Sequence, residues 1–168
     1  MDKKTKNLVR AAIIAALYAT LTHLQNLIAP GSASWAIQLR MSEALCVLAF
    51  FTPAAIPGLS LGCLLFNITS GAGLPLDFLV GTLATLFACA AMWYSRKILI
   101  GGIPLVGLAM PALFNAVLVG WELSVYIGGG FWANALYVAL GELIVLYVPG
   151  TILYHVIRSR NLDSRFFA

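Results

Sequence analysis

Long apolar stretches, separated by short segments with glycine, proline or polar residues, run through the whole chain. A helix that crosses a bilayer needs about 20 mostly apolar residues. Six stretches approach or reach that length, and we predict a helix in each: residues 8–28, 37–52, 55–70, 77–95, 104–127 and 132–157. The second and third are short, so we expect one or both to be tilted, kinked or partly re-entrant. Pro149 predicts a kink in the last helix.

The composition indicates that these helices lie in a membrane. Of 168 residues, 61% are hydrophobic and 10% are charged, against about 45–50% and about 25% in an average soluble domain. A soluble domain this small could not bury so much apolar surface in one core, and a β-barrel would show short alternating segments. We therefore predict an all-α membrane protein with six transmembrane helices, a single integral-membrane domain over residues 1–168. The first stretch exceeds the roughly 7–15 apolar residues of a signal peptide, so we expect it to be retained.

The basic residues predict an orientation. They flank the apolar stretches and form no patch, so the net charge of +4 does not indicate a nucleic-acid partner. Lys and Arg are enriched in cytoplasmic loops. With six spans, cytoplasmic N- and C-termini place nine of the ten basic residues inside: Lys3, Lys4, Lys6, Arg10, Arg96, Lys97, Arg158, Arg160 and Arg165. Trp35 and Trp132 then fall at the outer interface, where amphipathic rings are favoured.

Several ionisable residues lie within or at the edge of the apolar stretches. A charge at the bilayer centre costs at least a few kcal/mol, so such residues usually face the protein interior or a wet cavity. Arg40, Glu43 and Asp77 lie near outer helix ends, Glu122 lies one to two turns from an outer end, and Glu142 lies near the midplane. We therefore predict a polar pocket that opens outward and is closed below by apolar packing.

Helical spacing indicates which polar residues share a face. Arg40 and Glu43 are three residues apart, Asn115 and Glu122 seven, and Asn134 and Glu142 eight. Carboxylates and amides accept N–H donors, and aromatic rings stack on flat rings. The set therefore suits a planar, donor-rich heterocycle with a guanine-like edge. The predicted substrate-binding residues are Arg40, Glu43, Asn67, Asp77, Asn115, Glu122, Trp132 and Glu142.

Each of these residues also has a structural interpretation. Arg40 and Glu43 could pair and fix a helix start, and Asp77 could cap a helix. Glu122 and Glu142 could be protonated and structural. The remaining alternatives are helix bridging for Asn67 and Asn115, interface anchoring for Trp35 and Trp132, and packing or interfacial roles for His23 and His155.

Nothing in the sequence supplies energy or a cofactor. There is no P-loop motif, and Cys46, Cys63 and Cys89 form no C-x-x-C pair, so neither metal nor disulfide is indicated. Small residues spaced by four let helices approach closely. We therefore predict a docking surface for a partner on the first helix, with two alanine stripes: Ala11, Ala15 and Ala19, and Ala12 and Ala16.

Several blocks in order along the chain resemble the QueT family. The most specific are residues 40–45 (RMSEAL), 51–59 (FTPAAIPGL) and 135–143 (ALYVALGEL). The resemblance implies the substrate-binding S component of a bacterial energy-coupling factor (ECF) importer in the plasma membrane. It implies a six-helix S-component fold and a queuosine precursor, a 7-deazaguanine base, as ligand. It also implies a transmembrane coupling subunit and two ATPase subunits as partners, docking through helix 1 alanines, and toppling of the S component in the membrane.

Other functions remain open at this point. An S component for another small vitamin-like heterocycle would have the same architecture. A stand-alone proton-coupled carrier could use Glu122 or Glu142. An integral-membrane enzyme would need a nucleophile or a metal set, and two isolated histidines provide neither, so we do not expect an enzyme.

Overall fold

The structure, a computed structural model, describes residues 2–32, 39–70 and 76–166. Within these residues the regular structure is helical, apart from an isolated β-bridge between Ile100 and Ile103. Residues 71–75, between the predicted helices 55–70 and 77–95, and the interface position of Trp35 lie outside the described residues. The elements are α1 (Lys3–Ile28), η1 (Met41–Phe50), α2 (Ala55–Thr69), α3 (Asp77–Ser95), α4 (Leu105–Leu108), α5 (Met110–Tyr126), α6 (Phe131–Val145), η2 (Leu146–Gly150), α7 (Thr151–Ser159) and α8 (Leu162–Phe166).

Four of the described helical stretches are long and apolar enough to cross a membrane: Lys3–Ile28, Asp77–Ser95, Leu105–Tyr126 and Phe131–Ser159. The apolar helices η1 and α2 are shorter. The all-helical prediction is therefore confirmed, whereas six complete spans are not. The predicted bounds 77–95 coincide with those of α3, and the predicted 55–70 differs from α2 by one residue.

Two predicted helices differ from an α-helix in their hydrogen bonding. The second stretch forms η1, a ten-residue 3-10 helix, which at about 2.0 Å per residue is about 20 Å long. The last stretch is interrupted by η2, a π-helical segment that contains Pro149. Proline has no N–H to donate to the preceding turn, and π-segments accommodate such breaks. The irregularity predicted at Pro149 thus takes the form of a π-segment.

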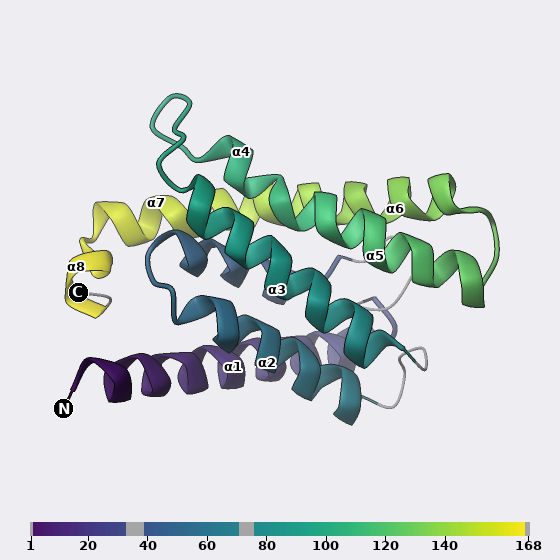
Figure 1. Cartoon of the computed structure of the whole chain (residues 1–168), viewed down its shortest axis with the longest axis horizontal. Helices are drawn as coiled ribbons and strands as arrows, with labels where there is room; N and C mark the ends of the chain where they lie inside the picture. The colour runs from purple at the N-terminus through teal and green to yellow at the C-terminus, as the bar shows by residue number, and fades with distance from the viewer. Residues whose placement is uncertain (1, 33–38, 71–75, 167–168) are drawn as a thin grey trace.

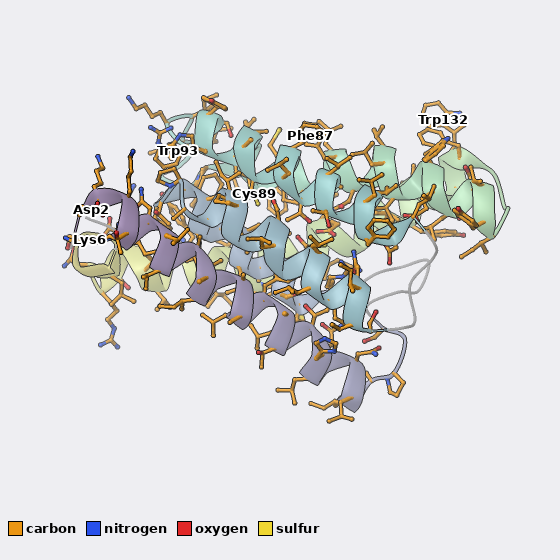
Figure 2. The ribbon with its side chains drawn as sticks, turned by 60° about the horizontal axis from the view of Figure 1, so that its bottom comes forward. Asp2, Lys6, Phe87, Cys89, Trp93 and Trp132 are labelled. Carbon is orange, nitrogen blue, oxygen red and sulfur yellow. The ribbon has the colours of Figure 1, made fainter. Side chains whose placement is uncertain are left out.

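The helices lie side by side along one long axis (Figure 1). α1 packs on α2, α2 on α3, α3 on α5, and α5 on α6. Both termini and the loop before α4 lie at one end, at the left of Figure 1. The turn between α5 and α6 lies at the opposite end, and Figure 2 likewise places Lys6 and Trp132 at opposite ends. The basic residues of the termini and of the 96–103 loop therefore gather at the end that we call the terminal end.

η1 forms the centre of the apolar core. Eight of its ten residues are buried, and it contacts α1, α2, α3, α6, η2 and α7. The core side chains around it come from distant parts of the chain, with Met92, Leu108 and Leu146 among the most buried, and Tyr154 also belongs to this core. Because η1 runs from Arg40 toward Tyr154 in α7, the core fills the space between its polar start and the terminal end.

α1 and α2 approach closely because small residues meet between them. A Cβ atom on Gly58 would lie 2.8 Å from the carbonyl oxygen of Ala11, and one on Gly62 would lie 2.8 Å from that of Ala15. Glycines spaced by four allow such contacts. Ala11 and Ala15 are buried in this contact, whereas Ala12 and Ala16 are exposed and Ala19 is half-buried.

This arrangement leaves only part of the predicted docking surface exposed. Ala11 and Ala15 pack inside the chain and present no surface to a partner in this structure. The exposed pair Ala12 and Ala16 remains as a prediction for docking.

We expect Gly62→Leu to destabilise the protein by about 1–3 kcal/mol, the usual cost of overpacking. A side chain at Gly62 would lie 2.7 Å from the Cβ of Tyr18 and force α1 away from α2. Thermal unfolding of the detergent-solubilised protein measures the effect. Leu65→Ala, on the exposed face of the same helix, serves as control and should change stability little. Equal unfolding temperatures for both variants would contradict the close α1–α2 contact.

Candidate functional site

Buried charged and amide side chains from the start of η1 and from α2, α3, α5 and α6 interact with one another. We call the following residues the acidic cluster: Arg40, Glu43, Asn67, Asp77, Asn115, Glu122 and Glu142. All are buried except Asp77, which is half-buried. They come from the start of η1, the end of α2, the start of α3, and the facing surfaces of α5 and α6. The structure thus brings together seven of the eight predicted substrate-binding residues.

Glu43 is held by neutral donors within the protein. The hydroxyl of Tyr18 donates a short hydrogen bond to Glu43 Oε1, and the thiol of Cys46 donates to Oε2 over 3.1 Å. Three residues per turn in a 3-10 helix place Glu43 and Cys46 directly above one another. Both carboxylate oxygens of Glu43 are therefore already occupied, which gives this residue a positioning role at the edge of the cluster.

Arg40 lies directly before η1 and is buried. Its guanidinium lies over the ring of Phe66, 5.4 Å from the centroid, and Nη1 donates to Cys63 Sγ over 3.6 Å. It interacts electrostatically with Glu43 and Asp77, and also with Glu142. A single guanidinium thus compensates carboxylates from three different elements.

Asn67 ties the end of α2 to the start of α3. Its Nδ2 donates to the backbone oxygen of Asp77 over 2.9 Å, while its Oδ1 is buried with no partner among the described residues. A Cβ on Gly81 would lie 3.0 Å from Asn67 Nδ2 and 3.4 Å from Asp77 Oδ1, so these two side chains approach each other over Gly81. Asp77 is the first residue of α3 after its N-cap Leu76, so the structure does not support the capping interpretation of Asp77.

α5 and α6 contribute the two remaining carboxylates. Asn115 Nδ2 donates to Glu142 Oε1 over 3.0 Å, and Glu142 Oε2 is buried without a partner. Glu122 is 1% exposed, and within the described residues neither of its carboxylate oxygens has a hydrogen-bond partner. Glu122 interacts electrostatically with Asp77 across the α3–α5 contact. A buried acceptor left unpaired costs free energy, so these oxygens mark the place where a donor-bearing ligand would be most stabilised.

Trp132, which was predicted to bind substrate, does not join the cluster. Its side chain is 83% exposed, packs edge-on against Phe131, and points away from the helices in Figure 2. As the second residue of α6, it lies ten residues before Glu142, about 15 Å away along the helix axis. Its position fits the alternative interpretation, an aromatic anchor at the membrane interface.

Two other polar residues have structural partners. His23 Nε2 lies 2.8 Å from Thr69 Oγ1 and packs edge-on against Phe66, which joins α1 to α2. Asn134 Nδ2 donates to the backbone oxygen of Gly128 over 2.7 Å and so closes the turn before α6. These contacts explain both residues without a ligand.

Two apolar grooves lie elsewhere, along α1, with volumes of about 340 and about 410 Å³. None of the predicted substrate-binding residues lines either of them. The first is lined by Arg10, Ile13, Ile14, Leu17, Leu45, Leu48, Leu153, Ile157 and Leu162, and the second by Lys4, Asn7, Leu8, Ala11, Pro53, Ala54, Pro57 and Leu61. Surfaces of this composition suit lipid or an apolar partner and not a polar ligand.

Comparisons with known proteins were made over the whole chain. The QueT transporter family matches residues 8–159. The queuosine precursor transporter QueT of Lactococcus lactis subsp. cremoris (strain MG1363) is 40% identical over 83 residues, which are 49% of this chain and 47% of that protein. The aligned part therefore spans about half the length of this relative. No solved structure matches the chain. Together with the four long apolar helices, the family match identifies a multi-pass membrane protein.

Proposed function

Since the chain belongs to the QueT transporter family, we propose that it binds a queuosine precursor, a 7-deazaguanine base, in the acidic cluster and serves its import. The observation that carries this proposal is Glu122, a buried carboxylate whose two oxygens both lack a partner in the described residues. The related Lactococcus protein bears the name of a queuosine precursor transporter. The chemistry of the cluster and the family thus support the same ligand class.

A guanine-type edge suits Glu122 because it presents two adjacent N–H donors, from the ring and from the 2-amino group. A carboxylate can accept both at once, and such charge-assisted, two-point hydrogen bonds are stronger and more directional than single neutral ones. Adenine-type bases lack this pair of donors on one edge. We therefore assign the recognition of the base edge to Glu122.

We further propose that both termini are cytoplasmic and that the acidic cluster opens to the outside. The basic residues at the terminal end support this orientation, because Lys and Arg are enriched on the cytoplasmic side. The six-helix S-component fold requires η1 and α2 to complete the membrane domain as two short apolar helices. The apolar core around η1 then separates the cluster from the cytoplasm.

As an S component, the chain would depend on a transmembrane coupling subunit and two ATPases for energy. The exposed pair Ala12 and Ala16 offers these partners a strip of small side chains on α1, flanked by the exposed side chains of Ile13 and Leu17. Small residues at this spacing favour close approach of another helix.

Uptake by reconstituted vesicles tests this function. We expect labelled 7-deazaguanine base to accumulate only when the chain is reconstituted with the coupling subunit and both ATPases and when ATP is supplied. ATPases inactivated by mutation are the control. Accumulation by the chain alone, driven by a proton gradient, would instead identify a stand-alone carrier.

A bulky residue on the exposed alanine face should uncouple docking from ligand binding. We expect Ala16→Phe to reduce co-purification with the coupling subunit by at least about tenfold, because a side chain of this size prevents close helix contact, and to leave ligand affinity unchanged. Ala133→Phe, at an exposed alanine of α6, is the matched control and should keep the complex. Unchanged co-purification of Ala16→Phe would show that the partner docks elsewhere.

A further inference from the structure

The acidic cluster is unbalanced in both charge and hydrogen bonding. It contains the carboxylates of Glu43, Asp77, Glu122 and Glu142 but only the guanidinium of Arg40. All buried side-chain polar atoms that lack a partner in the described residues are oxygens, namely Asn67 Oδ1, both oxygens of Glu122, and Glu142 Oε2. Carboxylate oxygens accept hydrogen bonds and cannot donate them when ionised. A ligand that supplies hydrogen-bond donors and positive charge would satisfy these oxygens.

An organic cation suits these acceptors better than a metal ion. The described residues contain no group of three His, Cys, Asp or Glu side chains placed to hold a metal ion. Glu122 and Glu142 each approach a different part of the cluster: Glu122 interacts electrostatically with Asp77, and Glu142 with Glu43. Separated acceptors of this kind fit a ligand with donors at both ends.

The two unpaired carboxylates differ in how many acceptors they offer. Glu122 has both oxygens available, whereas Asn115 occupies one oxygen of Glu142 and leaves only Oε2. Asn115 is hydrogen-bonded to Glu142, so its position along α5 gives the height of Glu142. Asn115 and Glu122 are seven residues apart, which is about 10 Å along α5 at about 1.5 Å per residue. A fused bicyclic base with a one-carbon amine arm covers such a span with a hydrogen bond at each end.

On the basis of the proposed function, we infer that the acidic cluster selects a precursor with an ammonium group, 7-aminomethyl-7-deazaguanine, and that Glu142 determines this specificity. Glu122 accepts the two N–H donors of the base edge. Glu142 Oε2 accepts an N–H of the ammonium, which carries its charge at neutral pH as a lysine side chain does. Asn67 Oδ1 offers a further acceptor at the α2 side of the cluster.

The uncharged 7-cyano-7-deazaguanine should bind less well for the same reason. Its nitrile nitrogen is an acceptor and would face the unpaired oxygen of Glu142. A site built around buried hydrogen-bonding groups rejects ligands that leave these groups unpaired. The discrimination therefore arises from the substituent at position 7, while the base edge is read equally in both compounds.

Titrations of the purified, folded protein in detergent with three ligands test the inference. 7-Aminomethyl-7-deazaguanine should bind at least about tenfold more tightly than the 7-cyano compound. 7-Hydroxymethyl-7-deazaguanine has nearly the same size as the aminomethyl compound and can donate a hydrogen bond to Glu142 Oε2, but it carries no charge, so it should bind less tightly than the aminomethyl compound and more tightly than the cyano compound. It separates the effect of charge from that of shape.

Two carboxylate variants assign the preference to a residue. Glu142→Gln should bring the aminomethyl and cyano affinities within about threefold of each other. Aminomethyl binding weakens because the ammonium loses its charged acceptor, and cyano binding improves because the glutamine amide can donate to the nitrile. Glu122→Gln should weaken both ligands alike. If Glu142→Gln does not fold, the three-ligand comparison on the native protein still decides the charge preference.

The outcomes separate this inference from the proposed function. Equal or tighter binding of the cyano compound, or hydroxymethyl binding as tight as aminomethyl, would overturn the charge preference and leave the proposed function standing. An aminomethyl preference that persists in Glu142→Gln would overturn the role of Glu142. Folded protein that binds none of the 7-deazaguanine bases would overturn both.

Discussion

Glu122→Gln is expected to weaken the binding of any 7-deazaguanine base by about 30-fold or more. Glutamine keeps the size of the side chain but replaces one acceptor by an amide donor that faces the donors of the base. Losing a buried, charge-assisted contact costs about 2–5 kcal/mol, and each 1.4 kcal/mol is about a factor of ten in affinity. Calorimetric titration of the detergent-solubilised variant measures the loss.

The stability of the same variant provides an independent check. Because Glu122 is buried without a partner, removing its charge should leave the unliganded protein as stable as before or make it more stable. Asp163→Asn is the matched control, at an exposed ion pair with Arg158 near the terminal end, and should affect neither quantity. Unchanged affinity together with a lower unfolding temperature would assign Glu122 a structural role instead.

Arg40→Gln is expected to destabilise the protein by about 3–5 kcal/mol, the cost of leaving buried carboxylates without their counter-charge. Arg40 interacts electrostatically with Glu43 and Asp77 and contacts the ring of Phe66. Its loss leaves the cluster without a positive charge. Chemical or thermal unfolding in a mild detergent measures the change.

A second substitution separates charge from packing at this position. The double variant Arg40→Gln/Glu43→Gln should recover part of the lost stability, because it removes one of the uncompensated charges. Arg158→Gln, at an exposed arginine, should cost no more than about 1 kcal/mol. If the double variant is less stable than Arg40→Gln alone, packing and not charge balance explains the role of Arg40.

The positions of the helices followed from the hydrophobic pattern, because an apolar stretch must be long to cross a membrane. α3 agrees with its predicted bounds, since a proline-containing segment precedes it and Arg96 follows it. The 3-10 form of η1 could not be predicted, because apolar residues at almost every position show no period. The break between α4 and α5 had a signal in Pro111, which lies in the first turn of α5, where proline is favoured.

For the candidate site, the sequence predicted which residues of one helix share a face, but not which residues of different helices are in contact. The seven-residue spacing of Asn115 and Glu122 correctly predicted that they share a buried face. The hydrogen bond between Asn115 and Glu142 could not be predicted, because it depends on how α5 and α6 are rotated. Tyr18 was missed as a partner of Glu43, although its spacing of four from Ile14 and Thr22 marks the buried stripe of α1.

The role of Trp132 was ambiguous in the sequence for a different reason. An aromatic residue near an outer helix end is consistent both with stacking on a ligand and with anchoring in the interface. Only the rotation of α6 distinguishes them, and it turns this side chain outward. Exposure is thus the property that the sequence pattern could not provide here.

The central claim is that the acidic cluster holds the base, and an experimental structure of the protein with bound 7-aminomethyl-7-deazaguanine tests it most directly. We predict that the base lies between α3, α5 and α6, with its N–H edge within hydrogen-bonding distance of Glu122 and its amine near Glu142. A base bound in one of the apolar grooves along α1, or against Trp132, with the Glu122 oxygens still unpaired, would contradict the account.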